Sequence, residues 1–145
     1  MLARLLAQAR GEAIPRGGTA FRDVEEDAWY CDGVCWLAGE GILRGRGDDL
    51  FDPEAPLTVR ELSAMVDRFL TACGGEALSW GDGPADAPVT RAETVAALDL
   101  AAGREPDRQW IDRHLSALNT FADVPPCHPY FYEIVAAANL YEPIM

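Results

Sequence analysis

The stretch FRDVEEDAWYCDGVCWLAGEGILRGRGDDLFDPEAPLTVRE, residues 21–61, decides the fold that we expect. Its opening FRDV (residues 21–24) returns as FADV (residues 121–124), and an aromatic-rich segment follows each copy. Its closing EAPLTVRE (residues 54–61) returns as DAPVTRAE (residues 86–93). Self-similarity of this kind is typical of folds built from repeated structural units. The sequence therefore predicts two kinds of half-unit, each present more than once in a broken repeat.

Two of these half-units carry a strong start signal for a helix. Thr58 with Glu61, and Thr90 with Glu93, have the spacing of a capping box. In this motif the threonine hydroxyl accepts from the third helical N–H, and the glutamate reaches back to the first residue. The apolar residues that follow at helical spacing are Leu62, Met65, Val66, Phe69 and Leu70 after the first box, and Val95, Leu98 and Ala102 after the second.

Further short helices are expected elsewhere in the chain. A helix that begins at Ala28 should end at Gly41, because glycine is common just past a helix C-terminus. Another should open at Pro106 and Asp107. The residues expected to face inward are Val34, Leu37 and Ala38 in the first of these, Trp110, Ile111, Leu115 and Leu118 in the second, and Ile134, Val135 and Ala138 in a last helix from about residue 129 to residue 139. No convincing strand appears, so the expected fold class is all-α, a bundle of short helices.

The charge balance excludes several classes of partner. The 145 residues carry 24 acidic and 12 basic side chains, a net charge of −12. Nucleic-acid binding depends mainly on a basic surface, so no nucleic-acid partner is expected. Attraction to an anionic membrane surface is disfavoured for the same reason. Every basic residue is arginine, whose planar fork suits carboxylate and phosphate groups.

The hydropathy pattern bears on where the chain works. No apolar stretch is long enough to span a bilayer, so membrane insertion is not expected. Residues 1–10 lack the uninterrupted apolar core of a secretory signal. We therefore expect a cytoplasmic location for the chain as written, and the cell surface if it is a processed fragment.

Taken together, residues 21–61 resemble one whole S-layer homology (SLH) motif. The family pattern runs Phe-x-Asp-Val, a Trp-led helix, Gly-Ile-Ile-x-Gly, Gly-Asp-Gly, Phe-x-Pro and then Thr-Arg-Ala-Glu, and the stretch follows this order. Residues 81–93 resemble the second half of another copy, and residues 121–140 the first half of a third. The resemblance implies an approximate pseudo-threefold arrangement of motifs that anchors proteins to anionic, often pyruvylated, cell-wall polysaccharide.

The resemblance divides the chain into parts of one expected domain, residues 1–145. These parts are an N-terminal helix and linker (1–20), the complete motif (21–75), a degenerate second motif with an extra helix (76–120) and the first half of a third motif (121–145). The opening residues echo the helix that follows the first capping box, and we expect them to complete the C-terminal half-unit. A homo-oligomer, in which a second chain completes the partial motifs, stays open.

The family holds its ligand in grooves between motifs, and the Thr-Arg-Ala-Glu arginine and the Gly-Asp turn are implicated there. In the first motif of this chain Val59 stands where that arginine would be, and Arg60 follows one position late. An arginine in the first turn of a helix also lies beside free N–H groups and the positive end of the helix dipole, which favours anions. The ligand-binding residues that we expect are Arg44, Gly47, Asp48, Arg60, Trp80, Gly81, Asp82 and Arg91.

Each of these signals has a plainer explanation. Arg60 and Arg91 could pair with acids on their own surface. Trp29 and Trp36 are more often core residues than binding platforms, and we expect them in the core. Trp80 lies in a turn-rich stretch, where a binding role and a structural role are about equally favoured.

Neither a metal nor a cofactor is expected. Cys31 and Cys35 share a helix face and could join Cys127 and His128 in a zinc set, but the usual short-knuckle spacing is absent. The aspartates of residues 48–52 lack the twelve-residue loop and closing glutamate of a calcium site.

Catalysis is not expected either, because no acid, base and nucleophile occur at a productive spacing. His114 has Asp112 and Ser116 two positions away, on different faces of a helix. We therefore expect a non-catalytic module that recognises an anionic saccharide through arginine-lined grooves. Two alternatives stay open: a cytoplasmic protein that binds or sequesters a small anionic nucleotide- or sugar-like ligand, and a protein–protein adaptor.

Overall fold

The computed structural model describes residues 1–77 and 84–139, so Trp80, Gly81 and Asp82 lie outside the described residues. The helices are α1 (Leu2–Arg10), α2 (Cys31–Gly39), α3 (Val59–Ala72), α4 (Arg91–Ala101), α5 (Arg108–His114), a 3-10 helix η1 (Leu115–Ala117) and α6 (Phe131–Ala138). Within these described ranges, β-type pairing is limited to an isolated bridge between Thr58 and Pro88. The chain is therefore all-α, as the sequence predicts.

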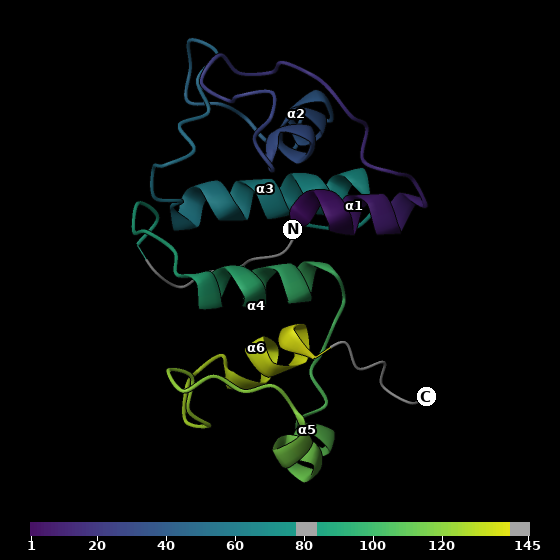
Figure 1. The fold of residues 1–145 in the computed structure, drawn as a ribbon, viewed down its shortest axis with the longest axis vertical. Coiled ribbons are helices and arrows are strands. Elements are labelled where there is room, and N and C mark those ends of the chain that lie inside the picture. The colour runs from purple at the N-terminus through teal and green to yellow at the C-terminus, as the bar shows by residue number, and fades with distance from the viewer. Residues whose placement is uncertain (78–83, 140–145) are drawn as a thin grey trace. The chain divides into compact units, whose positions relative to one another are not determined.

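The chain divides into two compact units, Met1–Pro88 and Val89–Met145. The first holds α1, α2 and α3, and the second holds α4, α5 and α6 (Figure 1). The sequence predicts a single domain and a pseudo-threefold arrangement of the motifs. Both concern how the two units are arranged relative to each other, and both stay predictions.

Helices α3 and α4 both begin with the capping box that their sequences indicate. The backbone N–H of Glu61 donates to the Thr58 hydroxyl oxygen at 3.3 Å, and the Glu61 carboxylate accepts the Thr58 N–H at 2.9 Å. Thr90 and Glu93 repeat this exchange at 3.2 and 2.7 Å. Two otherwise unpaired helix-end donors are satisfied at each site, which sets where the two helices start.

In the first unit, helix α1 packs against α2. Helix α3 turns the apolar side of its amphipathic surface inward, through Leu62, Val66 and Phe69. The other buried apolar residues of this unit are Leu2, Ala3, Leu6, Phe21, Val24, Cys31, Val34, Leu37, Ile42 and Leu43.

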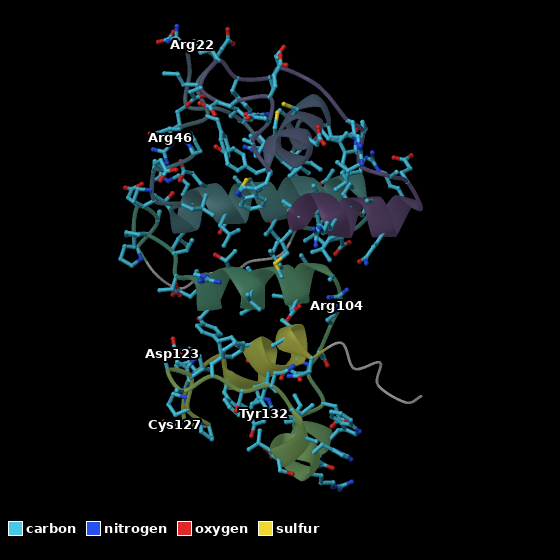
Figure 2. All side chains as sticks on the ribbon, in the orientation of Figure 1. Arg22, Arg46, Arg104, Asp123, Cys127 and Tyr132 are labelled. Atoms are coloured by element: carbon cyan, nitrogen blue, oxygen red, sulfur yellow. The ribbon has the colours of Figure 1, made fainter. Side chains whose placement is uncertain are left out.

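In the second unit, helix α6 packs against both α4 and α5. Its core is the cluster of Ile111, Phe131 and Val135, each almost fully buried. Tyr132 ties α6 to α5 from the surface: its hydroxyl donates to the Asp112 carboxylate at 3.1 Å, and its ring lies 4.9 Å from the Arg108 guanidinium (Figure 2).

The repeated Phe-x-Asp-Val segments have the same local backbone structure. In residues 21–31 three amides each donate to the carbonyl three residues earlier, at 3.4, 3.1 and 2.9 Å. Three amides at the matching places of residues 121–131 do the same, at 3.0, 2.8 and 3.0 Å. The donors are Val24, Ala28 and Cys31 in the first segment, and Val124, His128 and Phe131 in the second.

These consecutive turns overturn the expected start of the second helix. Helix α2 begins at Cys31, not at Ala28, because residues 25–30 form turns with three-residue hydrogen bonds. The expected burial of Trp29 is also wrong. The side chain leaves from a turn instead of a helix face, is 92% exposed, and contacts the Tyr30 ring edge-on. Trp36, within α2, is half-buried.

Two other details differ from the expectation. Helix α5 ends at His114, so Leu118 lies beyond both α5 and the following 3-10 turn. Ala138, expected to face inward, is exposed, because Phe131 and Val135 set the buried face of α6 and the helix ends at Ala138.

Candidate functional site

The candidate site is built around the turn of residues 44–53, which Asp23 holds in place. Its carboxylate accepts the backbone N–H groups of Phe51 at 2.8 Å and Asp52 at 2.7 Å. The Phe51 N–H bond, aided by that of Asp52, holds the pKa of the Asp23 carboxyl below its ordinary value. The ring of Phe51 lies 5.5 Å from that of Phe21, so the opening residue of the motif also contacts this turn.

The turn is tight enough to constrain which residues it contains. A side chain on Gly45 would come within 2.5 Å of the Leu50 carbonyl oxygen and of the Phe21 ring, so this position has no room for one. Asp48, Asp49 and Asp52 have φ angles of 52°, 56° and 59°. Aspartate tolerates this left-handed conformation better than most residues. The acidic run therefore has a structural explanation in the turn itself.

A groove of about 450 Å³ lies between this turn and the face of α3. It has four arginines along it, Arg44 and Arg46 from the turn and Arg60 and Arg68 from α3. Its other lining residues are Leu43, Gly45, Phe51, Asp52, Pro53, Ala55, Leu57, Glu61, Ala64 and Met65. Four guanidinium groups against two carboxylates make this groove basic in a strongly acidic chain.

Two of the four arginines are held by the fold. Arg46 pairs with the Glu61 carboxylate at 3.1 Å and donates to the Pro56 carbonyl at 3.2 Å, close to where α3 begins (Figure 2). Arg68 donates to the carbonyl of Ile42 at 3.2 Å. These bonds fix the directions of both side chains. Arg46 connects the turn to the start of α3, and Arg68 connects α3 to Ile42, just before the turn.

The other two arginines are open to a ligand. Arg44 is exposed and has no side-chain partner among the described residues. Arg60 pairs with Asp86 at 3.2 Å, but the two side chains are 68% and 86% exposed. Ion pairs this exposed contribute little, so an anion in the groove could replace Asp86 at small cost.

The structure brings together only part of the expected site. Arg44 and Arg60 line the groove, whereas Gly47 and Asp48 lie in the turn beside it and do not line it. Arg91 is the first residue of α4 in the second unit, where it is exposed. Sequence reasoning missed Arg46 and Arg68, whose position in the groove depends on contacts between the turn and α3.

The described residues offer little support for a metal centre. Among them, no group of three or more His, Cys, Asp or Glu side chains could hold an ion.

His114, considered above for catalysis, stacks on Trp110 with ring centroids 4.3 Å apart. No described helix combines the length and apolar character needed to cross a membrane.

Comparison with known proteins identifies the segment that carries this groove's turn. Residues 20–58 match the family model of the S-layer homology domain. The first motif is thus an S-layer homology segment, as its residues indicate. Neither the curated proteins nor the solved structures gave a match to the chain.

Proposed function

We propose, from the premise that residues 20–58 are an S-layer homology segment, that this chain is a non-catalytic module that binds an anionic saccharide of the cell-wall type. An S-layer homology segment suggests a module for binding cell-wall polysaccharide rather than an enzyme. The acidic nature of the saccharide and the groove that receives it are our inference from the arginines described above.

The observation that carries the proposal is a difference among the four groove arginines: two are bonded to the fold, and two are available to a ligand. Arg46 and Arg68 are bonded to the fold, so they contribute positive charge at fixed places. Arg44 has no side-chain partner among the described residues, and Arg60 has only its exposed pair with Asp86, so both guanidinium groups can form bidentate bonds with a carboxylate or phosphate of the ligand.

The charge of the rest of the chain makes this recognition local. With a net charge of −12, most of the surface repels an anionic polymer. Only a basic groove can overcome this repulsion, so specificity should depend on how well the ligand's acidic groups fit the groove. Loss of one free guanidinium should therefore have a large effect on affinity.

The test is co-sedimentation of the chain with purified cell wall that carries acidic polysaccharide. We expect Arg44→Ala with Arg60→Ala to weaken binding about tenfold or more, because each charge-assisted bond is worth roughly 1.5–3 kcal/mol. The matched control is Arg16→Ala with Arg22→Ala. It removes the same charge from exposed positions that do not line the groove.

Two outcomes of this experiment would contradict the proposal. Equal loss in both double variants would mean that total charge, and not this groove, determines binding. No retention of the unmodified chain would exclude the wall polysaccharide as ligand. Arg91→Ala, tested alone, reports whether the second unit contributes a contact of its own.

A small anionic ligand is a second candidate for the same groove. Its volume of about 450 Å³ falls within the range of ~300–1,000 Å³ typical of small-molecule sites. Native mass spectrometry of the purified chain should then show a bound small molecule that the Arg44→Ala, Arg60→Ala variant lacks. Repeated isolation of the empty chain would count against this candidate.

A protein partner is favoured by one observation, the nearly complete exposure of Trp29. Large aromatic side chains are enriched where proteins meet. An adaptor would lose its partner on Trp29→Ala and keep it when the groove arginines are replaced, which is the opposite of the pattern expected for a ligand in the groove.

A further inference from the structure

Helix α2 carries two cysteines that the proposed function does not use. Cys31 and Cys35 are four residues apart on one face of the helix, and their sulfur atoms lie 3.8 Å from each other. Cys31 is only 2% exposed. Cys35 is half-buried and lines a cavity of about 760 Å³ that adjoins the arginine groove and shares Leu43, Arg44 and Gly45 with it. One thiol of the pair is thus reached from the cavity and the other lies behind it.

The linker before the motif holds this pair in place. The backbone carbonyl of Gly18 lies 3.3 Å from the Cys35 sulfur and 3.7 Å from the Cys31 sulfur and can accept from both thiols. The neighbouring N–H of Gly17 donates to the Asp32 carboxylate at 2.9 Å, which fastens the linker to α2. A side chain on Gly18 would approach the Cys35 Cβ to 3.2 Å. The linker backbone therefore lies against both sulfurs and, at Gly17 and Gly18, forms part of the wall of the cavity beside Cys35.

Helix geometry favours a bridging atom over a direct sulfur–sulfur bond. Side chains four apart on a helix have Cβ atoms roughly 5–6 Å from each other. A disulfide needs Cβ atoms about 3.5–4.5 Å apart, so closing one would distort α2. An atom bonded to both sulfurs increases the span between the Cβ atoms and suits the undistorted helix.

We propose that Cys31 and Cys35 form a two-thiol site for a soft, thiophilic ion of the Cu(I) or trivalent arsenic type, entered from the cavity beside Cys35. Soft ions of this kind prefer thiolate sulfur over oxygen and nitrogen ligands. The Gly18 carbonyl oxygen is placed as a weak third contact.

The surroundings of the pair agree with this chemistry. Burial first, and the bond to Cys35 second, raise the pKa of the Cys31 thiol. The Cys31 sulfur therefore avoids a buried negative charge until an ion displaces its proton. The carboxylates of Asp32 and Glu26, which raise this pKa further, would favour a bound positive charge.

Phenylarsine oxide is a suitable probe because its adduct with two neighbouring thiols is more stable than its adduct with a single thiol. Two As–S bonds form, the two S–H bonds break, and the two protons leave with the oxide oxygen as one water molecule. Arsenic stays trivalent and no electrons are transferred. A single thiol forms only one As–S bond, which an excess of a competing monothiol displaces.

The experiment uses the full chain with the exposed cysteines removed, as the Cys73→Ser, Cys127→Ser variant. We expect its intact mass to show one phenylarsenic adduct that survives excess 2-mercaptoethanol. Adding Cys35→Ser, or separately Cys31→Ser, should abolish the resistant adduct. Circular dichroism of each variant checks that the helices are retained, and Cys35→Ser, at the more accessible position, is the variant expected to fold best.

Two outcomes would overturn the proposal. One is the absence of a resistant adduct on the Cys73→Ser, Cys127→Ser variant. The other is its persistence after either Cys31 or Cys35 is replaced. Arg44 lines both the cavity beside Cys35 and the groove, but the bonds to arsenic come from the two sulfurs, so the resistant adduct tests the thiol site whether or not the chain binds saccharide.

Discussion

The carboxylate of Asp23 accepts the backbone N–H of Phe51 at 2.8 Å across 28 residues of sequence. With a second bond to the N–H of Asp52, it closes the first motif around helix α2. The repeated segment offers a built-in comparison. Asp123 occupies the matching place, yet it is exposed and no hydrogen bond to it is found in the described part of the chain (Figure 2). Phe121 is 46% exposed, whereas the matching Phe21 is buried.

This contrast predicts unequal effects of the same substitution. Asp23→Asn replaces one accepting oxygen by an NH₂ group that faces backbone donors, so we expect the melting temperature to fall by several degrees. Asp123→Asn should leave it unchanged. Thermal unfolding followed by circular dichroism measures both, and equal melting temperatures for the two variants would contradict the role given to Asp23.

The same carboxylate predicts a pH dependence. Its folded-state pKa lies below the ordinary value because of the Phe51 N–H bond, so the folded state binds this proton less readily than the unfolded state. The stabilisation is fully present above the ordinary pKa of an aspartate, and is lost as pH falls through the folded-state pKa. The stability difference between the unmodified chain and Asp23→Asn should shrink as the pH is lowered. Urea unfolding of both at a series of pH values measures it, and a constant difference would be the contrary result.

Gly45→Ala should destabilise the turn by about 1–3 kcal/mol, since the added carbon has no room beside Leu50 and Phe21. Gly39→Ala is the matched control. It is the last residue of α2 and has open space around it, so alanine there should not destabilise the chain and should stabilise it by at most about 0.5 kcal/mol. Urea unfolding gives both free energies, and a neutral Gly45→Ala would show that the turn can relax.

Asp99 should be a source of instability near neutral pH. It is 4% exposed on α4, and burial raises the pKa of its carboxyl. The charge of Arg104 opposes this rise in the pKa, and the charge of Glu133 adds to it. A raised folded-state pKa means that stability falls as pH rises from the ordinary aspartate pKa through the folded-state value. Asp99→Asn should therefore raise the melting temperature at pH 7 and remove this dependence.

The control for this prediction is Glu105→Gln, which removes one negative charge from an exposed position. It should change the melting temperature little. If Asp99→Asn lowers the melting temperature instead, the Asp99 carboxylate must make a favourable interaction that outweighs its burial.

Features that depend on neighbouring residues could be predicted from the sequence. The two capping boxes place the starts of α3 and α4 because each involves residues only three apart. Asp107 likewise accepts the N–H of Trp110 at 2.9 Å and begins α5. The all-α fold class follows from such local signals and from the helical spacing of apolar residues.

Features that depend on contacts between residues far apart in the sequence could not be predicted from it. Trp29 has a large apolar side chain of the kind that is usually buried, but it lies in the turns before α2 and its side chain is exposed to solvent. Arg46 and Arg68 carry no sequence signal that separates them from other surface arginines. Their place in the groove depends on contacts between residues far apart in the sequence. Asp23 holds the turn by its bond to Phe51. Arg46 pairs with Glu61, and Arg68 donates to the carbonyl of Ile42.

The bonds from Asp23 to residues 51 and 52 also have a mechanical consequence. A tension applied at residue 21 and at the start of α3 would pass directly from residue 23 to residue 51, bypassing the intervening chain. Helix α2 and its two sulfurs would therefore carry no load until these bonds rupture, and the released length would then extend abruptly.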